Sequence, residues 1–259
     1  MKVDVLLGEA PVAPADVADR VVVVIDVLRA ATTAAVALKR GARALIPFES
    51  VEEAAQRART MDQESVRLGG ERRMVRIPGF DFGNSPLEYT EDRVSGHTVI
   101  FTTTNGTVAL TATHGARECF FAGFVNAQAT VDAVQAARGA DSDVTIVCAG
   151  SDRHLALEDV VCAGRFVRLL RASHPDAEYS DGARLAEMIE RPYQDSIAML
   201  ASDATHARSL IAAGFADDVQ CCLTLDSVPV AVRYADRQLR SIDSAPDANT
   251  TDAATPASH

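Results

Sequence analysis

The stretch VVVVIDVLRAATT at residues 21–33 decides the fold. Its run of β-branched residues at positions 21–25 is typical of a strand that is buried on both faces, as in a parallel sheet. The continuation at residues 30–40 predicts a helix that ends at Gly41, a residue type that often terminates helices. A buried strand followed directly by a helix is the repeating unit of α/β proteins.

The same strand–helix step recurs along the chain. Further strands are predicted at residues 44–48, 66–68, 98–102, 118–122 and 144–148, and helices at residues 51–61, 106–113, 127–138, 157–170, 182–191 and 202–213. Two more strands, at residues 219–223 and 228–232, are expected to form an antiparallel pair. The alternation predicts a three-layer α/β/α protein whose central sheet is mixed but mostly parallel.

Length and charge restrict the class of protein. The chain has 259 residues and a formal net charge of −11, and 47% of its residues are hydrophobic. We expect one domain over residues 1–240, with one lobe or two left open, and a disordered tail at residues 243–259. The acidic balance argues against a nucleic-acid partner, because phosphate binding needs a basic face. The oligomeric state stays open, with a homo-oligomer as one option.

Features that the sequence lacks give expectations about the compartment, the cysteines and the kind of site. No signal peptide and no apolar run of about 18 residues is present, so we expect a cytoplasmic protein without a membrane span. The five cysteines form no CxxC pair, which argues against a disulfide framework or a structural zinc site. The motifs GxxxxGK[ST], GxGxxG, GxSxG and HExxH are also missing, which excludes the common P-loop, dinucleotide, serine-hydrolase and zinc-protease sites.

Polar side chains follow four of the predicted strands. They are Asp26 and Arg29, then Glu71 and Arg72, then Thr103, Thr104, Asn105 and Gly106, and finally Glu158 and Asp159. Because the carboxyl ends of parallel strands lie along one edge of a sheet, we expect these groups to meet there. Carboxylates with few imidazoles suit Mg²⁺. An arginine and a Thr–Asn–Gly turn that opens a helix suit a phosphate.

Each of these features also has an ordinary structural explanation. The strand-end Asp26 can simply cap a helix, and so can the turn at residues 103–107. The acids that begin helix 157–170 can complement the helix dipole. Within the irregular segment 72–96, polar residues can be turn residues, although a long ordered loop is more often functional. The meeting of several such sets at one edge, rather than any single set, indicates a binding site.

Taken in order, several stretches resemble the 2-phosphosulfolactate phosphatase family, the ComB-like proteins. They are VVVVIDVLRAATT (21–33), LGGERR (68–73), GFDFGNSPLEYT (79–90), TTTNGT (102–107), NAQA (126–129), VTIVCAG (144–150), ALEDVVCAG (156–164), AGFADDVQCC (213–222) and VPV (228–230). The likeness covers about residues 1–235. Members often carry a Gly-rich stretch before the LEDV segment, where this chain has SDRH at residues 151–154, so we expect a reshaped pocket.

The resemblance implies a Mg²⁺-dependent phosphatase with a ComB-like α/β/α fold, whose substrate is 2-phospho-3-sulfolactate, an intermediate of coenzyme M biosynthesis. It points to the polar positions of those motifs, which are Asp26, Arg29, Glu71, Asp81, Asn84, Asn105, Glu158 and Asp159. As partners we therefore expect a small phosphorylated molecule and no nucleic acid or membrane.

Roles for these residues follow as predictions. The catalytic set is Asp26, Arg29, Glu71, Asn105 and Asp159; the substrate-binding set is Thr103, Thr104, Gly106, Arg72 and Asn84; the metal set is Asp26, Asp81 and Glu158. Whether Asp26 or a metal-bound water attacks phosphorus is left open. A sulfonate would need a further cation, for which Arg72, Arg73 and Arg153 are candidates.

Two other functions stay open. One is a phosphatase for a different small anionic phosphoester that uses the same residues. The other is a non-catalytic anion-binding protein with this fold. The strand-end carboxylates argue against the second, because a bare anion site gains nothing from acids around it.

Overall fold

The structure is a computed structural model, and it describes residues 1–8, 10–138, 142–152 and 154–242. Arg153 and the predicted tail at 243–259 lie outside the described residues. The strands are β1 (Lys2–Leu6), β2 (Val21–Ile25), β3 (Ala44–Pro47), β4 (Val66–Arg72), β5 (Val75–Arg76), β6 (Thr98–Thr102), β7 (Glu118–Ala122), β8 (Val144–Cys148), β9 (Glu178–Tyr179), β10 (Val232–Ala235) and β11 (Gln238–Ser241).

The helices pack on both sides of these strands. They are α1 (Pro14–Val17), α2 (Ala30–Lys39), α3 (Val51–Arg59), α4 (Glu91–Val94), α5 (Gly106–Thr111), α6 (Ala127–Ala137), α7 (Leu157–Ser173), α8 (Asp181–Glu190), α9 (Leu200–Asp203), α10 (Thr205–Ala212) and α11 (Ala216–Cys222), with short 3-10 helices at Pro86–Glu88, Phe124–Asn126, Arg191–Tyr193 and Ile197–Met199. Within the described ranges, none of the helices is long and apolar enough to cross a membrane.

Strand β2 shows why the valine run forms a buried central strand. Val21, Val23 and Ile25 lie in one apolar cluster with α6 and α7, whereas Val22 and Val24 lie in a second cluster with α2. Alternate residues of a strand point to opposite faces, so a strand covered on both faces must be apolar at every position. All five side chains are fully buried, and burial of each contributes about 1.5–3 kcal/mol.

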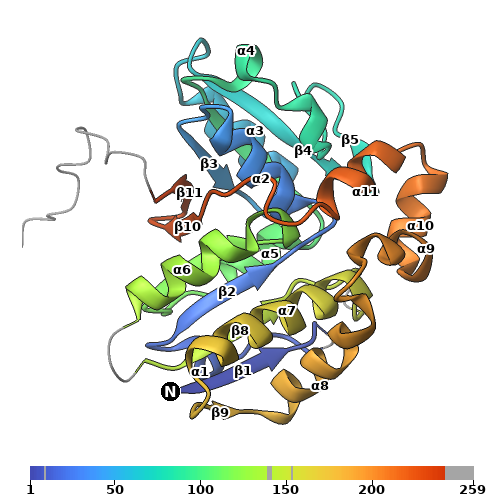
Figure 1. Cartoon of the computed structure of the whole chain (residues 1–259). Helices are drawn as coiled ribbons and strands as arrows, with labels where there is room; N and C mark the ends of the chain where they lie inside the picture. Colours follow the sequence, from blue (N-terminus) through green and yellow to red (C-terminus); the bar gives the residue numbers. More distant parts are fainter. Residues whose placement is uncertain (9, 139–141, 153, 243–259) are drawn as a thin grey trace, which may run out of the picture.

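The strands form an 11-stranded sheet in the order β5-β4-β6-β3-β11-β10-β7-β2-β8-β1-β9. The block β4-β6-β3 is parallel, and so is the block β7-β2-β8-β1-β9. Helices cover both faces, so the predicted three-layer, mostly parallel mixed fold is confirmed (Figure 1). The antiparallel hairpin β10–β11 lies between the two blocks and pairs with β7 on one side and β3 on the other.

Three antiparallel pairings separate the two parallel blocks, which the sequence did not indicate. Strand β11 is antiparallel to β3, β10 is antiparallel to β11, and β7 is antiparallel to β10. The polar residues therefore do not share one sheet edge, as expected for a single parallel sheet. Instead, the carboxyl ends of both blocks come together from different directions, on the side of the molecule where α10 and α11 lie (Figure 1).

Two predicted C-terminal strands are wrong. Residues 219–223 belong mostly to α11, because their buried side chains Val219, Cys222 and Leu223 follow helical spacing. An antiparallel pair does exist near this end, but it is formed by β10 and β11, and the predicted strand 228–232 overlaps β10 at one residue only. The predicted helix 202–213 is divided between α9 and α10 at Ala204. Strand β1 was not predicted.

Candidate active site

A cavity of about 610 Å³ lies where the carboxyl ends of β2, β4, β6 and β8 approach α10. The structure brings eight of the predicted site residues to its wall, which are Asp26, Arg29, Glu71, Asn84, Thr103, Thr104, Asn105 and Glu158. Asp26 and Asn105, far apart in sequence, thus line the same cavity. Asn84 comes from the irregular segment 72–96, which therefore contributes to the site.

Asp26 follows β2 directly and is almost fully buried. Its Oδ1 accepts a hydrogen bond from the N–H of Ala30 at 3.0 Å, so the helix-capping explanation holds for this oxygen. The other oxygen, Oδ2, lies against Gly106, where a Cβ would stand 2.5 Å away. Burial raises the pKa of Asp26 to about 7, and the negative charges of Glu71 and Glu158 add to this rise.

Glu158 and Asp159 are neighbours at the start of α7, yet their surroundings differ. Asp159 accepts hydrogen bonds from the N–H of Val27 at 2.9 Å and of Gly150 at 3.0 Å, and it does not line the cavity. It therefore ties the end of β2 to the end of β8. Glu158 does line the cavity, and among the described residues its buried Oε2 has no hydrogen-bond partner. Burial raises the pKa of both carboxyl groups.

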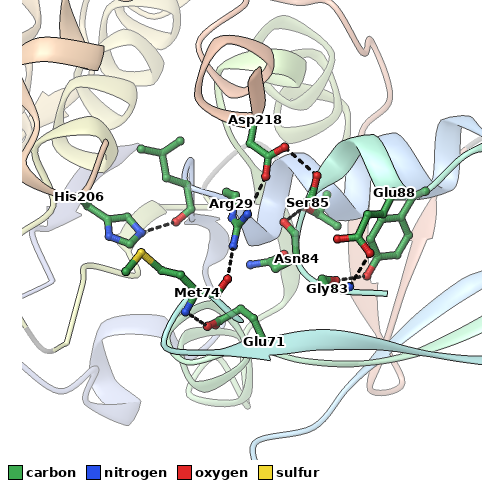
Figure 2. A network of polar contacts seen from close by, with 12 residues as sticks. Arg29, Glu71, Met74, Gly83, Asn84, Ser85, Glu88, His206 and Asp218 are labelled. Atoms are coloured by element: carbon green, nitrogen blue, oxygen red, sulfur yellow. Dashed lines mark hydrogen bonds and ion pairs between the residues drawn. The ribbon is translucent and has the colours of Figure 1, made fainter. Parts of the chain in front are cut away.

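Glu71 connects two loops that border the cavity. Its Oε1 accepts hydrogen bonds from both the N–H and the hydroxyl of Thr104, each at 2.9 Å. Its Oε2 accepts from the N–H of Met74 at 2.8 Å, at the tip of the β4–β5 hairpin (Figure 2). The predicted use of the Thr104 amide for phosphate thus competes with Glu71, and Glu71 acts here as a brace rather than as a free acid.

The turn after β6 is held by its own side chains. Thr103 Oγ1 accepts from the N–H of Thr107 at 3.3 Å, and Asn105 Oδ1 accepts from the N–H of Asp152 at 3.2 Å. Asn84 also lines the cavity, and its buried Oδ1 has no hydrogen-bond partner among the described residues. Two oxygen acceptors, one from Asn84 and one from Glu158, are therefore left without a donor at this cavity.

Four predicted residues are not part of the cavity lining, which are Asp159, Gly106, Asp81 and Arg72. The exposed Asp81 accepts a hydrogen bond from the N–H of Leu68 at 2.7 Å. Its carboxylate thus satisfies a backbone donor of β4. Arg72 donates to Thr102 Oγ1 at 2.8 Å and to the carbonyl of Glu49 at 2.7 Å, which turns it away from the site. The geometry thus gives no support to Asp81 as a metal ligand or to Arg72 as a substrate contact. Arg73, in contrast, lines the cavity.

Helices α10 and α11 supply residues that the sequence did not indicate. His206 lines the cavity, and its Nε2–H donates to the carbonyl of Leu28 at 3.1 Å. Asp218 forms an ion pair of 2.6 Å with Arg29 (Figure 2). The stretch that contains Asp218 was noted only as part of the resemblance. Both contacts join residues far apart in sequence, and no local pattern indicates such pairs.

The donor set fits a hard divalent cation that a substrate phosphate helps to bind. In the described part of the chain, no group of three or more His, Cys, Asp or Glu side chains is arranged to enclose a metal ion. Mg²⁺, however, is often held by one or two carboxylates together with substrate phosphates and water. The unpartnered oxygens of Glu158 and Asn84, with the Asp26 carboxylate, supply hard ligands of this kind.

Comparisons with known proteins show the family of this chain. The model of the 2-phosphosulpholactate phosphatase family matches residues 9–237. A relative from Symbiobacterium thermophilum, named "Probable 2-phosphosulfolactate phosphatase", is 40% identical over 86% of this chain and 95% of its own. Relatives of the same name from Clostridium beijerinckii and Caldanaerobacter subterraneus are 31% and 34% identical, over 92% and 87% of this chain and 99% and 92% of theirs. The chain belongs to the 2-phosphosulpholactate phosphatase family.

Proposed function

We propose that the protein is a Mg²⁺-dependent phosphatase that hydrolyses 2-phosphosulfolactate to 3-sulfolactate and phosphate. Membership of the family supports the reaction class. The observation that carries the proposal is the cavity in which Arg29 and the carboxylates of Asp26 and Glu158 lie together. An arginine and a hard cation are complementary to the two charges of a phosphate monoester. With this product, the chain would act in coenzyme M biosynthesis, in the cytoplasm.

The cation would be held by Asp26, Glu158 and the Oδ1 of Asn84. When bound, Mg²⁺ neutralises phosphate oxygens and stabilises the charge that develops on them during transfer. The Asp26 side chain is fixed by its hydrogen bond from the start of α2, whereas the other two residues are placed by their backbone: Glu158 in the first turn of α7, and Asn84 by a backbone contact. That contact is the hydroxyl of Thr33, which donates to the Asn84 carbonyl at 2.9 Å.

Asp26 also has the geometry of a nucleophile. Its Oδ1 is fixed by Ala30, whereas Oδ2 has no hydrogen bond from the described residues and lies beside Gly106. In this scheme Oδ2 forms a bond to phosphorus, the ester P–O bond breaks, and the leaving oxygen takes a proton from water. A second water then hydrolyses the aspartyl phosphate. Arg29 holds the phosphoryl oxygens throughout.

A second anionic group on the substrate needs its own cation. Of the two candidate arginines that the structure describes, Arg73 lines the cavity, whereas Arg72 is engaged by Thr102 and the Glu49 carbonyl. A cavity of about 610 Å³ has the size of a small-molecule site. Both facts support a short, doubly anionic phosphoester as substrate.

Phosphate release tests the proposal directly. The purified chain is incubated with 2-phosphosulfolactate and with a panel of small phosphomonoesters, each with Mg²⁺ and each with EDTA. We expect the highest kcat/KM on 2-phosphosulfolactate and no turnover in EDTA. Preference for another phosphoester would overturn the proposed substrate. Equal turnover in EDTA would overturn the proposed Mg²⁺ dependence. Failure to release phosphate from every member would overturn the phosphatase itself.

A further inference from the structure

Arg29 is held in place by two parts of the chain that are distant from it in sequence, the tip of the β4–β5 hairpin and the start of α11. Its Nη1 donates to Asp218 Oδ2 at 2.6 Å, and its Nη2 donates to the carbonyl of Met74 at 3.3 Å. The ring of Phe215 covers one side of the guanidinium, with the centre of the ring 4.3 Å away. Figure 2 shows the guanidinium between the Met74 carbonyl below it and Asp218 above it.

Asp218 is itself fixed. Its second oxygen, Oδ1, accepts a hydrogen bond from the hydroxyl of Ser85 at 2.7 Å. The side chains of Arg29 and Asp218 are only 2% and 4% exposed, so water hardly competes for these bonds. The carboxylate thus links the start of α2, the residues before Pro86 and helix α11 in one buried network (Figure 2).

These contacts orient Arg29 without occupying all of its N–H donors. A guanidinium has five N–H groups, and within the described residues these two contacts engage one on each terminal nitrogen. The remaining donors stay available for a ligand in the cavity that Arg29 lines. A long arginine side chain without such an anchor would sample several rotamers, and a buried cation without its partner would be destabilised.

We propose that Asp218 is a positioning residue for phosphate binding, which acts by holding the guanidinium of Arg29 at the angle that the phosphoryl group needs. The inference rests on the proposed function, since it takes Arg29 as the phosphate ligand. Asp218 lies 189 positions from Arg29 and does not line the cavity. Ser85 completes the device by orienting Asp218.

The test variant is Asp218→Asn, which keeps the shape of the side chain and removes its charge. Two quantities are measured on the full-length chain well below its melting temperature: the dissociation constant of inorganic phosphate by calorimetry, and kcat/KM for phosphate release. We expect both to worsen by about 10- to 100-fold, the range typical of a misplaced positioning group. The variant Asp218→Glu, which keeps the charge, should recover part of the loss.

Glu190→Gln is the matched control for loss of stability. Glu190 is fully buried and forms an ion pair with Arg168 at 3.1 Å. It also accepts a hydrogen bond from Gln194 at 2.6 Å. It therefore resembles Asp218 in burial and bonding, but it lies on α8, away from the cavity lining. We expect Glu190→Gln to lower Tm while phosphate affinity and kcat/KM stay at wild-type values.

A double-mutant cycle with Arg29→Lys separates positioning from a general structural effect. If Asp218 acts through Arg29, Asp218→Asn should have little further effect on phosphate affinity in the Arg29→Lys background. Full additivity, or wild-type phosphate affinity and kcat/KM in Asp218→Asn, would overturn the inference. Phosphate binding that depends on Asp218 in a chain without turnover would support the inference and overturn the proposed function. Normal turnover in Asp218→Asn would overturn the inference and support the proposed function.

Discussion

Gly106 lies so close to the carboxylate of Asp26 that a Cβ at this position would stand 2.5 Å from Oδ2. The same Cβ would also approach the side chains of Ala30 and Phe121 to 3.0 and 3.1 Å. The first turn of α5 thus reserves space for Asp26 through the lack of a side chain. Gly106 was predicted to bind substrate, but it does not line the cavity; its role seen here is steric, because it leaves room for the acid.

Gly106→Ala should lower kcat by at least about tenfold, since a displacement of the order of 1 Å at a reacting group is costly. The added methyl group forces Oδ2 away from its position. Gly123→Ala is the matched control, because its Cβ would meet its nearest neighbour, Thr32 Oγ1, at an ordinary 3.4 Å. Equal activity of the two variants would contradict the steric role.

Asp26→Asn should reduce kcat by ~10²- to 10⁴-fold, whether Asp26 is the nucleophile or a cation ligand. The two roles separate in a second measurement: mass spectrometry of acid-quenched enzyme detects a phosphorylated Asp26 only if it is the nucleophile. Asp143→Asn serves as control, because Asp143 precedes β8 and, within the described residues, its side chain accepts a hydrogen bond from the N–H of Lys2 and does not line the cavity. Wild-type turnover by a folded Asp26→Asn variant would remove Asp26 from the mechanism.

The metal-free protein should become less stable as pH rises through the neutral range. The pKa of Asp26 rises from its ordinary 3.8 to about 7 on folding, mainly because the group is buried. The folded state then binds this proton more tightly than the unfolded state, so the free energy of unfolding falls between about pH 4 and 7. Urea denaturation in EDTA across this range measures the slope.

The control for this slope is the Asp26→Asn variant, which lacks the titrating proton. Its stability should decline less steeply over the same pH range, and above pH 7 it should be more stable than the metal-free wild type. An identical slope in both proteins would show that Asp26 keeps its ordinary acidity in the fold.

Mg²⁺ should raise the Tm of the wild-type chain, and EDTA should reverse the rise. A ligand that binds only the folded state stabilises it in proportion to its occupancy. In Glu158→Gln the rise should be much smaller, since one hard oxygen ligand has lost its charge. Glu190→Gln should keep the full shift. A shift of equal size in Glu158→Gln would place the cation elsewhere.

Native thiol reactivity should be confined to one cysteine. Burial raises the pKa of Cys119 to about 12 and raises those of Cys148, Cys162 and Cys222 as well, so few thiolates form at pH 8. Burial raises the pKa of Cys221 too, but its thiol is partly exposed, so a reagent can reach it. With a disulfide reagent at pH 8, Cys221 should react first and the others only on unfolding. Cys221→Ser should abolish the early phase, and rapid reaction of a second thiol would contradict this order.

Local sequence patterns predicted the elements that are decided by burial. The apolar run of β2 and the apolar spacing of α7 each fit one kind of element, because burial decides where the apolar residues stand. Strand β1 also carried a signal, since its buried Val3 and Val5 alternate with more exposed neighbours. The strand predicted at residues 219–223 is wrong because a short apolar run fits a strand and a helix equally well, whereas the acids at 217–218 favour a helix start.

The sequence predicted the site residues that follow a predicted strand, and it missed those on the last helices. Asp26, Asn105 and Glu158 reach one cavity because each follows a strand of the core. Asp81 was misplaced because a polar residue in a turn looks the same whether it satisfies a strand or binds a ligand. Asp218 and His206 were missed because their contacts with the Leu28–Arg29 segment depend on how the last helices fold back over the sheet.

The β10–β11 hairpin has a consequence for how the protein is made. It lies between β3 and β7, yet the ribosome produces it after every other strand of the sheet. During synthesis the two parallel blocks can each gather their own helices, but nothing in the sheet joins them until residue 241 has emerged. The sheet that carries the cavity can therefore be completed only after the hairpin has been synthesised.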